Sequence, residues 1–144
     1  MTTALSETVR QPPIGLTSSQ LSDLALGLGQ LDGLRLSPDS FKPFKFEDDT
    51  VWKIASNQSL IVAQLAVFDR AKKLLVGQHE MVEGMKITPE NAERVQAFMA
   101  ALDSLQQRVI DVPGLAKIKR SELKVGANQI SPSTLARLMP ILEE

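Results

Sequence analysis

The chain has 144 residues, which is the length of one ordinary domain. Its composition, 43% apolar and 23% charged, is typical of a globular protein and excludes a wholly disordered chain. A net charge of −1 gives no overall field to attract nucleic acid or an anionic membrane, and the absence of cysteine excludes disulfides and thiolate zinc sites.

The N-terminal part is predicted to be an arm followed by one helix. Residues 1–16 show no periodicity, and two consecutive prolines oppose both a helix and a paired strand. Residues 18–31 carry leucines at 3-4-3 spacing, which predicts an amphipathic helix capped by Ser18 or Ser19. The stripe is either core docked within the chain or a protein interface. Its members are Leu21, Leu24, Leu28 and Leu31.

Residues 32–49 are predicted to be an extended connector, because Pro38 and Pro43 oppose regular structure across it. Three of the five phenylalanines in the chain lie in this segment, and such large apolar side chains must be buried somewhere. Either the connector wraps the helical core, or it fills a groove on another subunit. The interface candidates here are Phe41, Phe44 and Phe46.

Residues 50–84 give the longest helical signal. Asp48, Asp49 and Thr50 supply an N-cap and negative charge at the helix start. A continuous helix of this length would reach about 50 Å, which exceeds the diameter of a compact domain of this size. Gly77 is the expected weak point. The apolar positions that repeat every seven residues are Ile54, Ile61, Phe68, Leu75 and Val82.

A second helix is predicted for residues 89–112, after a turn at residues 85–89. Its apolar positions keep an unbroken 3-4 spacing that is typical of coiled-coil packing. The short connection between the two helices favours an antiparallel hairpin. The periodic residues are Val95, Phe98, Leu102, Leu105, Val109 and Val112.

The C-terminal part is less regular. Residues 115–130 fit a helical turn or two, with a short strand around residues 123–125 as the alternative. Residues 132–143 are predicted to form a final short helix, with Ser131 as the N-cap and Pro132 at the first helical position.

Residues 129–139, QISPSTLARLM, resemble the second half of a helix-turn-helix. The matching residues are Ile130, Ser131, Pro132, Thr134, Leu135, Arg137 and Leu138. The first half departs from the pattern, because Gln129 stands where a glycine is expected and Lys124 where an apolar residue is expected. The resemblance implies a recognition helix that meets base edges. An ordinary capped helix is the preferred interpretation. The nucleic-acid-binding candidates of the alternative are Lys117, Lys119, Arg120, Ser133 and Arg137.

No catalytic motif is found in the sequence. His79 is the one histidine, and although Glu83 shares its helix face and Glu80 is adjacent, a structural histidine is favoured over a metal ligand. The glycines of residues 27–33 lack the preceding strand and following lysine of a phosphate-binding loop. We therefore expect no enzyme activity, no metal and no cofactor.

The predicted fold is mostly α, with a long antiparallel helical hairpin, short flanking N- and C-terminal helices, and an extended N-terminal arm and connector. Its parts are residues 1–49, 50–112 and 113–144, within one domain. Helices too long for a compact globule and an arm with apolar anchors favour a non-enzymatic structural or assembly protein. We expect such a protein to act through protein–protein contacts and to self-associate as a homo-oligomer or larger assembly. It could be a component of a viral particle or of another large complex.

Two alternatives remain open. One is a nucleic-acid-binding regulator with a degenerate helix-turn-helix at residues 115–139, although nucleic acid is disfavoured by the charge balance. The other is a small helical adaptor or chaperone. The sequence shows neither a signal peptide nor a stretch that spans a membrane. We therefore expect a protein that is cytoplasmic when made, with no membrane partner, and that can be incorporated into a larger particle.

Overall fold

The structure is a computed structural model that describes residues 13–126 and 128–143. It confirms the mostly helical class predicted from the sequence. The helices are α2 (Ser18–Gly29), α3 (Asp48–Gln78), α4 (Ala92–Gln107), α5 (Arg120–Leu123) and α6 (Pro132–Arg137), with 3-10 turns at Gln30–Asp32 and Met139–Ile141. The strands are β1 (Ile14–Leu16), β2 (Gly33–Ser37), β3 (Ser40–Pro43), β4 (Ile110–Val112), β5 (Ile118–Lys119) and β6 (Leu142–Glu143).

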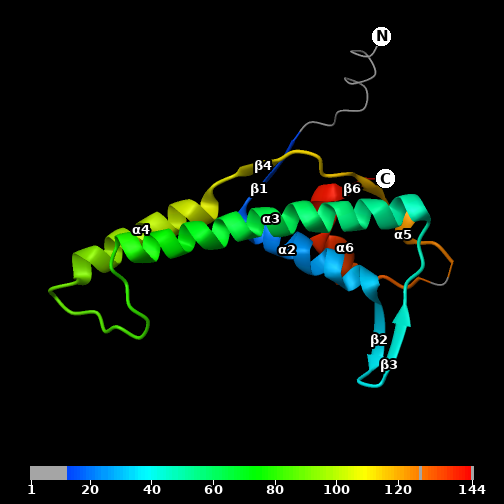
Figure 1. Ribbon diagram of the computed structural model, residues 1–144. Coiled ribbons are helices and arrows are strands. Elements are labelled where there is room, and N and C mark those ends of the chain that lie inside the picture. The colour runs from blue at the N-terminus through cyan, green and yellow to red at the C-terminus, as the bar shows by residue number, and fades with distance from the viewer. Residues whose placement is uncertain (1–12, 127, 144) are drawn as a thin grey trace, which may run out of the picture.

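Helix α3, with 31 residues, forms the long axis of the molecule (Figure 1). Helix α2 packs along the middle of α3, and α4 lies beside the C-terminal part of α3. The β2–β3 hairpin projects from the body near the N-terminal end of α3. The C-terminal segment closes the core on the side of α2, where α6 packs.

The core is a cluster of leucines and other aliphatic side chains where α2, α3 and the C-terminal segment meet. All four leucines of the predicted stripe are buried in it, three on α2 and Leu31 in the 3-10 turn that follows, which is the docked-core arrangement. Helix α2 is capped by Thr17 and Gln20, which exchange side-chain-to-backbone hydrogen bonds in a capping box. The predicted serine caps were therefore one or two residues too late.

Strand β1 pairs antiparallel with β4, with Ile14 opposite Val112. The arm predicted for residues 1–16 is extended at its end, as predicted, but that end is a paired strand, because proline no longer blocks pairing after Pro13. Residues 1–12 of the predicted arm lie outside the described residues. Strands β5 and β6 form a short parallel pair that holds the C-terminal residues in the fold.

The connector predicted for residues 32–49 was wrong over its central part, which forms the antiparallel hairpin β2–β3. The prolines are compatible with the hairpin because Pro38 lies between the strands and Pro43 is the last residue of β3. Gly33 is needed for close approach, since a Cβ there would lie 2.6 Å from the Phe41 ring and 2.5 Å from the Lys42 carbonyl oxygen.

Both long helices are shorter than predicted. Helix α3 ends at Gln78, directly after Gly77, and Glu80 then adopts a left-handed φ of 53°, which a helix cannot continue. Helix α4 covers residues 92–107 rather than 89–112, because Ile110 and Val112 belong to β4. The aliphatic residues at the end of the predicted helix fit strand alternation as well as helical spacing.

Residues 115–130 contain the helical turn that the sequence predicts, as α5, together with a strand at another position than the predicted one. The strand lies at residues 118–119 rather than around 123–125, and it leads directly into the single turn of α5. The cap of the last helix is confirmed, because Ser131 accepts from the Thr134 N–H at 3.2 Å and Pro132 is the first helical residue. That helix ends at Arg137, well before the predicted residue 143.

Candidate interaction surface

The middle of α3 carries no charge on any face. Residues 54–68 read IASNQSLIVAQLAVF and contain no Asp, Glu, Lys or Arg. One side of this stretch is packed against the core, where Asn57, Ile61 and Phe68 are buried. An exposed helix face is normally charged or polar, and a helix that is apolar all round is normally covered. The opposite side of this stretch is therefore unusual for a surface that faces only water.

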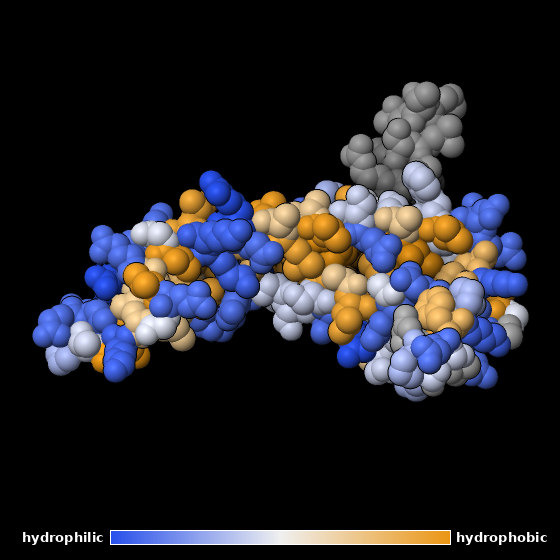
Figure 2. Space-filling view, turned by 60° about the horizontal axis from the view of Figure 1, so that its bottom comes forward, coloured by the Kyte–Doolittle hydropathy of each residue, from blue (hydrophilic) through white to orange (hydrophobic). Residues whose placement is uncertain are grey.

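This exposed side is defined as the outer stripe of α3, and it borders α2 at its centre, where Ser59 and Val62 line a cleft with Ala25. Its residues follow a 3-4-3-4 spacing, which places them on one line of the helix. They are Trp52, Ala55, Ser59, Val62 and Ala66, and all five are exposed. The exposed fractions of Trp52 and Val62 are 73% and 60%. Val67, 61% exposed, and Ala63 broaden the stripe on one side. Figure 2 shows apolar side chains on the surface over the middle of the molecule.

Charged residues stand at both ends of the outer stripe. Asp48 lies one turn before Trp52 and Lys73 lies two turns after Ala66, and both side chains are exposed. Asp48 and Asp49 begin the helix, where negative charge is favoured by the helix dipole. The N-terminal end of the stripe is therefore acidic, and Lys73 places a positive charge at the far end, whereas Lys72 lines the cleft beside α2 and pairs with Asp69. Between the two ends the line holds Trp52 and then small or apolar side chains as far as Ala66, followed by the exposed Asp69.

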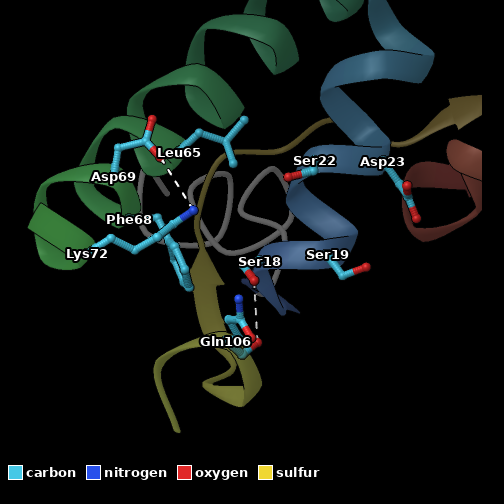
Figure 3. Close-up of a pocket in the computed structure, with 9 residues that line it drawn as sticks. All are labelled: Ser18, Ser19, Ser22, Asp23, Leu65, Phe68, Asp69, Lys72 and Gln106. Atoms are coloured by element: carbon cyan, nitrogen blue, oxygen red, sulfur yellow. Dashed lines mark hydrogen bonds and ion pairs between the residues drawn. The ribbon is translucent and has the colours of Figure 1, made fainter. Parts of the chain in front are cut away.

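A cleft of about 450 Å³ lies where the start of α2 meets α3 and the end of α4 (Figure 3). The hydroxyl of Ser18 donates to the Gln106 carbonyl oxygen at 3.4 Å and joins two of these helices. Lys72 Nζ lies 4.0 Å from Asp69 and 6.0 Å from the centre of the Phe68 ring. The cleft offers hydroxyls and a few charges for hydrogen bonding, but no histidine or cysteine among its lining residues to activate a nucleophile.

A second, more apolar groove of about 390 Å³ runs between α3 and α4. Its lining residues are Ala71, Leu74, Leu75, Ala101, Ser104, Leu105 and Arg108. Beyond this groove, the His79 ring meets the Phe98 ring edge-on, with centroids 5.9 Å apart. The side chains of α4 are at most half-buried, so α4 contributes little to the main core.

A polar cluster around Glu122 attaches the C-terminal segment to the start of α3. The Glu122 carboxylate accepts from Lys53 at 3.0 Å, from the Thr50 hydroxyl at 3.1 Å and from the Lys119 backbone N–H at 2.9 Å. Burial by itself raises the pKa of Glu122. The backbone N–H of Lys119, together with Lys53 and Thr50, outweighs burial, and the pKa of Glu122 lies below its ordinary value. This cluster is a structural tie within the chain.

The interface candidates from the sequence are mostly occupied within the chain. Leu21, Leu24, Leu28 and Leu31 lie in the core and are not on the surface. The rings of Phe44 and Phe46 meet edge-on with centroids 6.3 Å apart, both are half-buried, and Phe46 packs against the core. Phe41 is the most exposed of the three and lies over Gly33 in the hairpin.

The predicted helix-turn-helix does not have the geometry of that motif. Helix α5 is a single turn, and eight residues separate it from α6, whereas the motif joins two longer helices by a turn of three or four residues. Helix α6 packs against α2, where a Cβ on Gly27 would lie 3.0 Å from the Arg137 Cβ. The expectation of a degenerate helix-turn-helix at residues 115–139 is therefore corrected.

The nucleic-acid-binding candidates lie in different environments. Lys117 Nζ donates to the Pro140 carbonyl oxygen at 3.0 Å, and Arg137 donates to the Gln30 side chain at 3.2 Å. Lys119 and Ser133 are exposed, and Arg120 is half-buried beside the Met139 sulfur. Lys117 and Arg137 thus hold the C-terminal segment in place.

The residues considered for a metal site are not brought together with further ligands. Across residues 13–126 and 128–143, no group of three or more His, Cys, Asp or Glu side chains is placed to hold a metal ion. In the same part of the chain, no helix has both the length and the apolar character required to cross a lipid bilayer.

The outer stripe of α3 was not among the candidate residues from the sequence. The seven-residue repeat directs attention to the buried side of the helix and predicts nothing about the outer stripe. The signal that could have found it is the fifteen-residue stretch without charge, because its polar residues are too few to cover the whole outer face. No protein-family model, no curated protein and no solved structure matches this chain.

Proposed function

We propose that this protein is a non-enzymatic structural protein that self-associates, and that the outer stripe of α3 is its contact surface. The observation that carries the proposal is the exposed apolar side of an uncharged stretch of helix. Solvent-exposed helix faces gain solubility from charge, whereas contact surfaces are depleted of charge at their centre. A component of a larger assembly, a viral particle included, is the setting we propose for such a protein.

A second copy of the chain is the proposed occupant because the outer stripe is complementary to itself. Trp52 is a large aromatic side chain that is 73% exposed, and exposed tryptophans are common anchors in protein interfaces. Ala55, Ser59 and Ala66 on the same stripe are small and leave room for a large side chain or for close approach of a second helix. The stripe thus combines a projecting aromatic side chain with small residues that allow a second helix to approach closely.

We also propose that α3 and α4 act as the antiparallel helical hairpin that the sequence predicts. The ring contact between His79 and Phe98, and the 3.4 Å ion pair between Arg94 and Glu80, support this arrangement beyond the end of α3. In this role α4 braces the C-terminal part of α3, so that the outer stripe is held on a stiff support.

The test is a pair of matched substitutions measured by sedimentation equilibrium. Val62→Glu places a charge in the outer stripe, and Val82→Glu makes the same change at a valine, 68% exposed, that lies beyond α3. We expect Val62→Glu to abolish self-association and Val82→Glu to preserve it, while circular dichroism shows both folded. Equal behaviour of the two variants would contradict the proposal. A monomer that binds a different protein at fixed stoichiometry through the same stripe would favour the adaptor alternative instead.

A further inference from the structure

The two ends of the outer stripe carry opposite charge, and this asymmetry indicates how two copies would meet. Asp48 stands at the N-terminal end and Lys73 at the C-terminal end, 25 positions apart, or about 37 Å along the helix. Both are exposed and both lie on the line of the stripe. A second stripe can lie against the first in parallel or in antiparallel orientation, and the end charges distinguish the two.

We propose that two copies of α3 pack antiparallel about a two-fold axis between Ser59 and Val62, with Asp48 of each copy opposite Lys73 of the other. This inference rests on the proposed self-association. In the parallel orientation Asp48 would face Asp48 and Lys73 would face Lys73, and like charges at both ends oppose association. In the antiparallel orientation each end forms one pair of opposite charges, and the two-fold axis makes the pairs identical.

The same register matches the small residues of the stripe. With the axis between Ser59 and Val62, Ala55 of one copy lies opposite Ala66 of the other, because each is the same number of positions from the axis. Two alanines at a crossing allow helix axes to approach to about 8 Å. Ser59 then lies opposite Val62, so the centre of the contact contains neither charge nor a large side chain. Asp69, which also borders the stripe, lies opposite Trp52 and has Lys72 at 4.0 Å on its own helix.

Engineered cysteines test the orientation directly, because the natural chain contains none. The variants are Ala55→Cys and Ala66→Cys, both at exposed alanines of the stripe. A disulfide forms only when the two Cα atoms come within about 7 Å. In the antiparallel dimer, residue 55 of one copy is about 16 Å along the axis from residue 55 of the other, but directly opposite residue 66.

We expect a mixture of Ala55→Cys and Ala66→Cys chains to form a cross-linked heterodimer on mild oxidation, and each variant alone to stay uncross-linked. Cross-linking of each variant with itself would show a parallel dimer and overturn this inference, while the proposed self-association would stand. A dimer by sedimentation without any of these cross-links would place the contact elsewhere and also overturn it. A protein that stays monomeric under all conditions would contradict the proposed self-association itself.

Charge reversal gives an independent readout of the end pairs. Asp48→Lys or Lys73→Glu alone should raise the dissociation constant of the dimer by at least about threefold, and the double variant should restore the original value. The effect is modest because each exposed ion pair contributes little and the dimer contains only two of them. In a parallel dimer each single reversal replaces one like pair by another and leaves the affinity unchanged. Single reversals without effect would therefore contradict the antiparallel arrangement.

Discussion

The side-chain amide of Asn57 pairs with both backbone groups of Ala116. Asn57 Nδ2 donates to the Ala116 carbonyl oxygen at 2.9 Å, and Asn57 Oδ1 accepts from the Ala116 N–H at 2.8 Å. Asn57 is completely buried, so the pair is shielded from water. Asn128 makes the same kind of pair with the backbone of Lys45, at 3.0 and 2.7 Å. Asn57 thus attaches the irregular segment at Ala116 to α3, and Asn128 joins two irregular segments to each other.

Asn57→Ala should destabilise the protein by about 2–4 kcal/mol, because it leaves a backbone donor and acceptor of Ala116 without their partners. The free energy of unfolding from urea titration measures the effect. Gln58→Ala, at a half-buried position one residue on, is the matched control and should cost less than about 1 kcal/mol. Equal losses in the two variants would show that the Asn57–Ala116 pair contributes no special stability.

Glu122 should make the stability depend on pH in the acidic range. Its pKa is lower in the folded protein than in the unfolded chain, where a glutamate has a pKa of about 4.3. The carboxylate therefore stabilises the fold fully above that value, and the contribution fades as the pH falls through the lowered pKa. Glu122→Gln should be less stable than the natural protein at pH 7, and the difference should shrink as the pH is lowered towards 3.

Denaturant titrations at several pH values check this expectation. Glu83→Gln is the control, because Glu83 is exposed in the connection between α3 and α4. Its effect on the free energy of unfolding should stay within about 0.5 kcal/mol at every pH. A gap between Glu122→Gln and the natural protein that stays constant down to pH 3 would contradict the role given to the carboxylate.

Gly27 and Gly29 should respond in opposite ways to alanine. Both lie in α2, and alanine is favoured over glycine in a helix by about 1 kcal/mol. A Cβ on Gly29 would meet no atom within 4 Å, so Gly29→Ala should raise the free energy of unfolding by about 0.5–1 kcal/mol. A Cβ on Gly27 would lie 3.0 Å from Leu138 and from Arg137, so Gly27→Ala should gain nothing or lose stability. If Gly27→Ala instead raised the free energy of unfolding, α6 would have to shift easily away from α2 to make room for the added methyl group.

The elements that could be predicted from the sequence are those set by local signals. The leucine spacing after Thr17 defines the buried side of α2, and Ser131-Pro132 defines the start of α6. The start of α3 follows from Asp48 and Asp49, whose charge favours a helix N-terminus. Each of these signals acts within a few residues and needs no distant partner.

The elements that could not be predicted depend on distant partners. Ile14–Leu16 becomes a strand only because Ile110–Val112 lies beside it, nearly a hundred residues later. The same pairing ends α4 early, since the strand register puts Val112 in the core at a position that helical spacing also allowed. Periodicity also could not indicate that Asn57, a polar residue on the buried side of α3, has a backbone to pair with.

The candidate surface was missed for a related reason. The seven-residue repeat through Ile61 and Phe68 correctly marks buried positions of α3. The repeat says nothing of the opposite side. Whether that side is exposed depends on where the other elements of the fold pack. Only the structure shows that Trp52 and Val62 stay exposed after α2 and the C-terminal segment have packed.

The central claim is that the outer stripe joins two copies of the chain, and the mass of the natural protein tests it most directly. Light scattering on a size-exclusion column, over a concentration series, measures that mass. We predict a species of twice the chain mass of 15.8 kDa that persists on dilution until the dissociation constant is approached. A single species of 15.8 kDa at every concentration would contradict the claim, and the exposed stripe of α3 would then have no second copy to cover it.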